Sequence, residues 1–190
     1  MPAFGLPSGA ACIVITATVG TALTLLFYGI RLFIRLRINR PFGADDLHCT
    51  IATLFAILCT SLTISQTRFG LGQHIVTLTA EELNTQHLLA WLATLAFNMA
   101  LAFSMLSMCF LIVRVTKMTS QATPAYVAAG LTTLWAVVAL FFIAFQCKLP
   151  YPWQTRPRRR CLDLYMIWLC LTITRSTLEF INVIIAVTLV

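Results

Sequence analysis

Long apolar runs separated by short polar segments dominate this chain. Crossing a hydrocarbon core of about 30 Å takes roughly 20 residues of helix, and five runs meet that need: 10–33, 47–65, 88–113, 125–145 and 165–190. A bilayer offers no water to unpaired backbone groups, so such runs must be helical, and they lack the alternation of barrel strands. The pattern predicts an all-α, polytopic transmembrane helix bundle that forms one domain over residues 1–190.

The polar segments carry recognisable turn and cap signals. Gly70 and Gly72 mark a turn after the second run. Thr79 and Glu82 have capping-box spacing, so the third helix is expected to begin near residue 80, ahead of its apolar run. Pro124 is expected to open the fourth helix, because proline is tolerated in a first helical turn.

Asp45 and Asp46 stand where the second helix should start. Unpaired N–H groups and the helix dipole favour carboxylates at that position. The two residues could also be taken for a metal-binding diad. Helix capping is the favoured interpretation, because no further carboxylate lies nearby in the sequence.

Composition excludes an ordinary soluble domain and a disordered chain. Apolar residues make up 59% of the sequence and charged residues 10%, against about 45–50% and about 25% in soluble domains. The net charge is +7, and most of the bases form two clusters: Arg31, Arg35, Arg37 and Arg40, and Arg156, Arg158, Arg159 and Arg160. Such clusters could bind nucleic acid, but beside apolar runs they favour anionic lipid headgroups, so the bilayer is the expected partner.

Two arguments place the N-terminus outside, and the plasma membrane is the expected location. The loops on the two sides of the membrane carry equal numbers of Lys and Arg residues. The first run, however, has no basic residue before it and four after it, which favours an outside N-terminus. Cys147 and Cys161 share the fourth polar loop and form the candidate disulfide. A disulfide there needs the oxidising, outer side, which agrees with the charge argument.

Arg175 and Glu179 form a candidate intramembrane polar pair in the fifth run. Their i, i+4 spacing allows them to pair on one helix face. Intramembrane charges usually face a partner or a cavity, which makes a polar site inside the bundle one interpretation. A self-neutralised pair that packs against its neighbours is another, and a third is that this segment does not span the membrane.

Two further helix faces stand out. Ser107 and Arg114 lie on one face of the third run, where Arg114 could contact a cytoplasmic partner or extend to headgroups. Thr16, Gly20 and Thr24 recur every four residues in the first run. This small-residue pattern predicts close packing against another helix.

No enzyme, metal or cofactor signature occurs in the sequence. His48, His74 and His87 are isolated from one another, and no HExxH, GxSxG, P-loop or GxGxxG pattern is present. Both lysines, Lys117 and Lys148, lie outside the apolar runs, so no span offers a Schiff-base lysine to retinal. We expect neither catalysis nor a bound cofactor.

Five short motifs in a fixed order resemble the fungal integral membrane proteins with a rhodopsin-like domain, a GPCR-like seven-helix group. The resemblance rests on Arg31-Leu32-Phe33 with Arg37 and Arg40, Phe42-Gly43-Ala44-Asp45-Asp46, Phe69-Gly70-Leu71-Gly72-Gln73-His74, Leu106-Ser107 through Arg114, and Phe145-Gln146-Cys147 with Pro150, Trp153 and Cys161. It implies an outside N-terminus, an outer fourth loop and, for some members, signalling through G proteins. The rhodopsin label denotes topology and not retinal chemistry.

The chain departs from this family pattern in three ways. Met105 stands where the family usually has lysine, and Asn182 stands about where it usually has aspartate. The sixth and seventh helices are missing, so the chain is expected to be truncated after the fifth. The favoured function is a GPCR-like sensor of extracellular cues with an unknown ligand, acting with a G protein or other membrane proteins. The alternative is a non-signalling membrane component, such as a transporter remnant or a helix-bundle interaction protein, from a truncated or degenerate copy.

Overall fold

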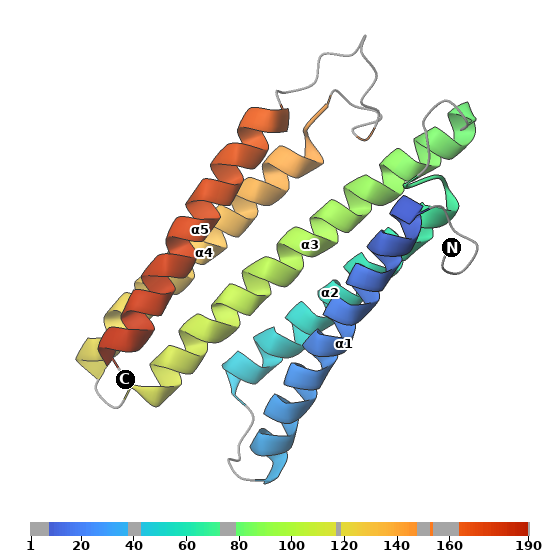
Figure 1. Cartoon of the computed structure of the whole chain (residues 1–190). Coiled ribbons are helices and arrows are strands. Elements are labelled where there is room, and N and C mark those ends of the chain that lie inside the picture. The colour runs from blue at the N-terminus through green and yellow to red at the C-terminus, as the bar shows by residue number, and fades with distance from the viewer. Residues whose placement is uncertain are drawn as a thin grey trace.

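A computed structural model describes residues 8–37, 43–72, 79–116, 119–147, 153 and 164–189 of the chain. Its helices are α1 (Ser8–Arg37), α2 (Ala44–Arg68), α3 (Ala80–Val115), α4 (Thr119–Ala144) and α5 (Leu164–Leu189), which run up and down side by side (Figure 1). All five are long and apolar enough to cross a membrane. The all-α class with five apolar helices is therefore confirmed, while the single-domain assignment stays a prediction.

The caps and turns follow the sequence signals at most positions. Thr79 caps α3, since its side chain accepts from the Glu82 N–H, and the Glu82 carboxylate accepts from the Thr79 N–H at 2.9 Å. Gly70 and Gly72 adopt φ of 98° and 89° in the turn after α2, a backbone region that favours glycine.

The expected start of α4 at Pro124 was wrong. The helix begins at Thr119 and contains Pro124 in its second turn. A proline there removes a single intrahelical hydrogen bond close to the helix start, so most of the helix keeps its hydrogen-bonding pattern.

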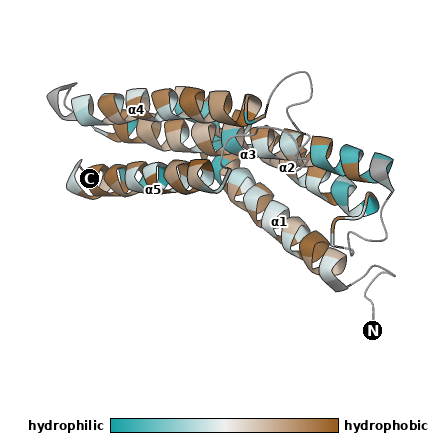
Figure 2. Ribbon diagram, turned by 90° about the horizontal axis from the view of Figure 1, so that it is seen from above, coloured by the Kyte–Doolittle hydropathy of each residue, from teal (hydrophilic) through white to brown (hydrophobic). Residues whose placement is uncertain are grey.

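Helix α3 is the centre of the bundle. Among the described helices, it packs against α2, α4 and α5, whereas α1 packs against α2 alone. Two indole groups connect α3, α4 and α5. Trp91 Nε1 of α3 donates to the Ile143 carbonyl of α4 at 2.9 Å, and Trp135 Nε1 of α4 donates to Thr174 of α5 at 3.2 Å. The packing leaves α1 and α5 at opposite sides of α3 (Figures 1 and 2).

The outer surface suits a hydrocarbon solvent. Large apolar side chains are exposed along every helix, Phe27, Leu54, Phe97, Phe141 and Val187 among them. Figure 2 shows apolar colours running along α4 and α5, with hydrophilic colours gathered where α3 begins. Exposed apolar surface on this scale would be unstable in water and is expected against lipid.

The small-residue face of α1 does not make the helix contact predicted for it. Thr16, Gly20 and Thr24 are exposed, and a side chain at Gly20 would meet open space. Helix α1 instead contacts α2 through two hydroxyl pairs, Thr21 with Thr60 at 2.8 Å and Tyr28 with Thr50 at 3.0 Å. The predicted packing was wrong because α1 turns a different face to its only neighbour in the described ranges.

Candidate functional site

A pair of buried carboxylates begins α2. Asp45 and Asp46 occupy the first turn of the helix and are 2% and 5% exposed. The N-cap residue is Gly43, whose N–H donates to Asp46 Oδ2 at 3.4 Å. Asp46 therefore contributes to capping, as the sequence suggested. Both carboxylates also bind side chains of other helices.

Two arginines of α1 bind both carboxylates. Arg35 donates from Nη2 to Asp45 Oδ2 at 2.6 Å and from Nε to Asp46 Oδ1 at 3.1 Å. Arg31 contacts the same two oxygens, at 3.1 and 3.3 Å. Residues four apart share a helix face, so each guanidinium can span both aspartates. The expectation that this whole basic cluster meets headgroups was wrong for Arg31 and Arg35.

Helix α3 completes the cluster from the opposite side. Arg114 Nη1 lies 3.1 Å from Asp45 Oδ1 and 3.6 Å from Asp46 Oδ2. Ser107, two turns earlier, donates to the Asp45 carbonyl at 2.8 Å. Arg114 had been expected to reach a partner or headgroups, and the structure instead turns it toward α2. We call Arg31, Arg35, Arg114, Asp45 and Asp46 the Arg–Asp cluster.

The Arg–Asp cluster packs closely against Gly43. A Cβ built on Gly43 would overlap Asp45 Oδ1 and the Arg114 guanidinium. Its backbone has φ of −109°, which any residue can adopt. The constraint is therefore one of space, because a larger residue at position 43 would displace the Asp45 carboxylate or the Arg114 guanidinium.

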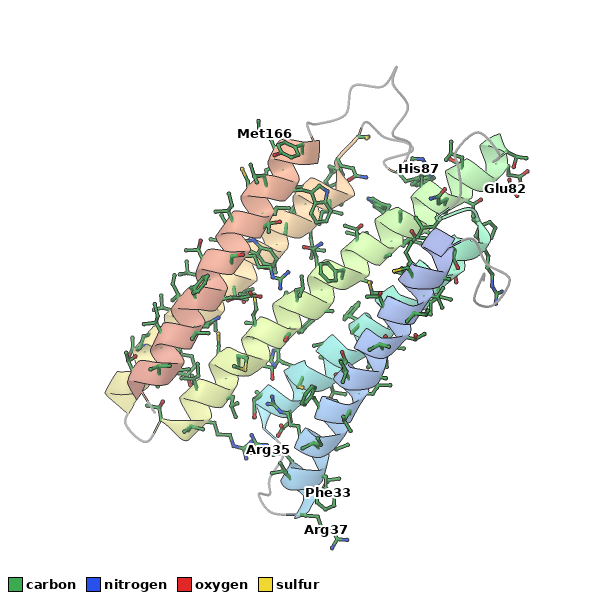
Figure 3. The ribbon with its side chains drawn as sticks, viewed as in Figure 1. Phe33, Arg35, Arg37, Glu82, His87 and Met166 are labelled. Atoms are coloured by element: carbon green, nitrogen blue, oxygen red, sulfur yellow. The ribbon has the colours of Figure 1, made fainter. Side chains whose placement is uncertain are left out.

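The cluster connects three helix ends through ion pairs. It joins the end of α1, the start of α2 and the end of α3 with three positive and two negative side chains, a formal net charge of +1. A buried charge that loses its partner destabilises a fold by about 3–5 kcal/mol, because its desolvation is no longer compensated. Figure 3 shows Arg35 at this end of the bundle, with Arg37 at the end of α1 and pointing away from the other helices.

A groove of about 720 Å³ opens beside the cluster, between α1, α2 and α3. Small and hydroxyl side chains dominate its walls, and Arg31 lies at one end. The exposed face of α1 with Thr16, Gly20 and Thr24 forms part of its lining. The groove and the cluster therefore share a residue, Arg31.

The second half of the bundle has an uncharged polar contact in its core. Cys109 of α3 is fully buried and donates its thiol to Asn182 Oδ1 of α5 at 3.4 Å. Met105, one turn earlier on α3, is also buried. The two positions where the sequence lacks an expected charge thus lie in the interior.

The pair on α5 is formed but outward-facing. Arg175 Nη2 lies 2.8 Å from Glu179 Oε1, and the two side chains are 27% and 46% exposed. Of the interpretations made from sequence, pairing at i, i+4 agrees with this geometry. Burial of the whole pair inside the bundle was wrong, since the Glu179 side chain is 46% exposed.

Only some of the other residues singled out from sequence lie within the described ranges. Cys147 is buried just after α4, whereas Phe42, His74 and Cys161 fall outside the described residues. The Cys147–Cys161 disulfide therefore stays a prediction. Within the described ranges, no group of three or more His, Cys, Asp or Glu residues could hold a metal ion.

Sequence reasoning missed the Arg–Asp cluster as a unit. Asp45 and Asp46 were interpreted through their own helix, and Arg114 lies 69 positions from Asp45. One signal was available, because Arg31 and Arg35 stand four apart just before two adjacent carboxylates. A short connection between α1 and α2 brings those four side chains to the same end of the bundle.

Comparison with known proteins places this architecture in a family. The fungal rhodopsin domain matches residues 30–190, which include the whole Arg–Asp cluster and helices α2 to α5. No curated protein and no solved structure matches the chain. The match covers most of the chain and agrees with five membrane-spanning helices. The chain therefore belongs to the fungal rhodopsin domain family and is a multi-pass integral membrane protein.

Proposed function

We propose that this protein is a GPCR-like sensor of extracellular cues whose Arg–Asp cluster lies at the cytoplasmic end. The observation that carries the proposal is the sharing of two buried carboxylates by arginines from two helices. A receptor needs an element with two arrangements that an outer ligand and an inner partner can both bias. One arginine can leave this cluster while the others still neutralise the carboxylates, which provides a second arrangement.

The groove offers a physical link between a ligand and the cluster. Arg31 lines the groove and binds both Asp45 and Asp46. A molecule in the groove that binds the Arg31 side chain would weaken its two carboxylate contacts and leave those of Arg35 and Arg114. Signalling in this proposal is therefore a redistribution of arginines over two fixed carboxylates.

An outside N-terminus at the plasma membrane is part of the proposal. Arg35 and Arg37 lie in the last turn of α1, at the end that carries the cluster. The opposite end carries Cys147, and the five other described cysteines have free thiols. The proposed Cys147–Cys161 disulfide would then form on the oxidising side.

The same geometry supports a role without catalysis. Asp45 and Asp46 are both occupied by arginines, which leaves neither carboxylate free to take a proton from a substrate. A general base must reach the proton that it abstracts. We therefore propose a binding and signalling protein and not an enzyme.

Nucleotide exchange on heterotrimeric G proteins tests the proposal. Membranes containing the wild-type chain, Arg31→Gln or Arg37→Gln are assayed with each class of Gα subunit, with and without candidate surface cues. Arg31→Gln is expected to raise basal exchange because it removes one contact to each aspartate. Arg37→Gln is the matched control, since Arg37 lies at the same helix end but is exposed.

Unchanged exchange in all three proteins, with each Gα and each cue, would contradict the sensor proposal. Orientation is tested separately with an N-terminal epitope on intact cells. Antibody binding without permeabilisation is expected, and binding only after permeabilisation would contradict the outside N-terminus.

A non-signalling interaction protein is the second candidate. The observation that favours it is the outward-facing pair of Arg175 and Glu179 on α5, which suits contact with another membrane protein. Normal insertion and assembly with no effect on any Gα would favour this candidate over the sensor.

A further inference from the structure

The outer flank of α5 carries an ion pair at the middle of the membrane. The candidate span runs from Tyr165 to Thr188, so Arg175 and Glu179 lie on either side of its midpoint. Their side chains are 27% and 46% exposed. Charges at the centre of a bilayer are costly and usually face a partner or a water-filled cavity. This flank is therefore a poor surface for hydrocarbon.

The ion pair leaves hydrogen-bonding capacity unused. Arg175 donates from both Nε and Nη2 to one oxygen, Glu179 Oε1, at 3.0 and 2.8 Å. In the part of the chain that the structure describes, Arg175 Nη1 and Glu179 Oε2 make no hydrogen bond or ion pair. A donor and an acceptor are thus both available on this flank.

The pair begins at the border of the face that α5 turns toward the bundle core and extends away from it. Helix α5 packs inward through Leu171 and Asn182, which are buried. Arg175 is half-buried and lies beside these two residues, whereas Thr172, Glu179 and Val183 are exposed and share the adjoining flank of the helix. Figure 1 shows α5 at an edge of the bundle beside α4. Among the described helices, α5 contacts only α4 and α3, and the side chains on this flank are left exposed.

We propose that this flank is a homodimer interface in which two copies of α5 pair around a two-fold axis along the membrane normal. A two-fold interface brings the same patch of both copies together, so the patch must complement itself. A patch with one arginine and one glutamate does so. Arg175 Nη1 of each copy binds Glu179 Oε2 of the other, which satisfies the four groups left over in the two monomers.

The helix geometry allows these cross-contacts. In two parallel copies Arg175 and Glu179 differ in depth by four residues, or about 6 Å at 1.5 Å per residue. An arginine side chain can reach over that distance. Lipid headgroups lie at the membrane surface and not at its middle, so they do not meet the pair at this depth. A second copy supplies both charges at the right depth by symmetry.

Association is tested with the 190-residue chain in lipid nanodiscs and vesicles, by fluorescence energy transfer at increasing dilution in lipid. Replacing both charges, Arg175→Leu with Glu179→Leu, is expected to weaken dimerisation about 10- to 100-fold, since two symmetric polar contacts are lost. This variant should fold, because it removes charge from the hydrocarbon. Exchanging the charges, Arg175→Glu with Glu179→Arg, is expected to restore the dimer.

Cysteine crosslinking locates the interface independently. Val183→Cys and Ile184→Cys are compared after Cys170→Ser, because Val183 and Ile184 are similarly exposed, at 57% and 60%, but face different directions. Oxidation is expected to crosslink Val183→Cys above the parent and to leave Ile184→Cys at the parent level. Three results would each overturn the proposal: a monomeric wild type, a double-leucine variant that dimerises as tightly as wild type, or stronger crosslinking through position 184.

Discussion

The protein uses arginine–carboxylate contacts in two opposite ways. In the Arg–Asp cluster, Asp45 and Asp46 are 2% and 5% exposed and receive arginines from both α1 and α3. On α5, Arg175 and Glu179 pair within one helix and remain partly exposed. The first arrangement joins helices of the same chain. The second joins nothing within the described residues and leaves polar atoms for a neighbour.

The difference shows that location decides what an ion pair does in a membrane protein. The cluster lies at helix ends, where water and headgroups are close and a network of charges can form with less desolvation. The α5 pair lies at mid-span, where charge is tolerated only when it is neutralised or covered. Stability is therefore expected to depend on the cluster, and association on the pair.

The largest expected effect is that of Asp45→Leu. This substitution leaves three arginines facing one carboxylate, so the free energy of unfolding is expected to fall by about 3–5 kcal/mol. Denaturant unfolding in detergent measures the change. Arg37→Leu serves as the control and should stay within about 0.5 kcal/mol of wild type. Equal losses in the two variants would show that the cluster has no special role.

Gly43→Ala tests the space around the cluster. The added Cβ overlaps Asp45 Oδ1 and the Arg114 guanidinium, and we expect a loss of about 1–3 kcal/mol, as for overpacking. Gly130→Ala is the control in α4, where a Cβ meets open space, and it should gain up to about 1 kcal/mol of stability. Thermal unfolding of both variants checks the prediction, and a stabilised Gly43→Ala would refute the close approach of Arg114.

Ser107→Ala is expected to have a smaller effect. It removes the hydroxyl that donates to the Asp45 carbonyl at 2.8 Å, a bond worth about 1 kcal/mol. Ser104→Ala, one turn earlier and exposed, provides the comparison and should be neutral. The same unfolding assay distinguishes them, and identical behaviour would argue that Ser107 does not help to hold α2 against α3.

The smallest expected effect on fold stability is at the α5 pair. In dilute detergent, where dimers dissociate, Arg175→Leu with Glu179→Leu should change the free energy of unfolding by less than about 0.5 kcal/mol. A loss as large as that of Asp45→Leu would remove the contrast between the two regions.

The sequence predicted the helices well because each element is encoded locally. Apolar length and the Thr79–Glu82 cap lie within a few residues of the structure that they specify. Helix α4 was the exception at its start, since Pro124 was interpreted as the opening residue of the helix but lies in its second turn. Length and composition thus predicted which segments span, and the ends required the structure.

The candidate site was harder to predict because it is assembled across the chain. The adjacent aspartates and the arginines four apart were visible, but Arg114 joins them only once α3 packs on α2. The prediction for Gly20 failed for a related reason, since a small-residue pattern indicates that a helix can pack closely but not which face its neighbour takes.

A double-mutant cycle between Asp45 and Arg114 tests the central claim most directly. Unfolding free energies are measured for Asp45→Leu, Arg114→Leu and the double variant. If Arg114 binds Asp45 across the α2–α3 contact, the double variant should lose about 1–3 kcal/mol less than the two single losses added together. Additivity within about 0.5 kcal/mol would contradict the cluster as the tie between these helices.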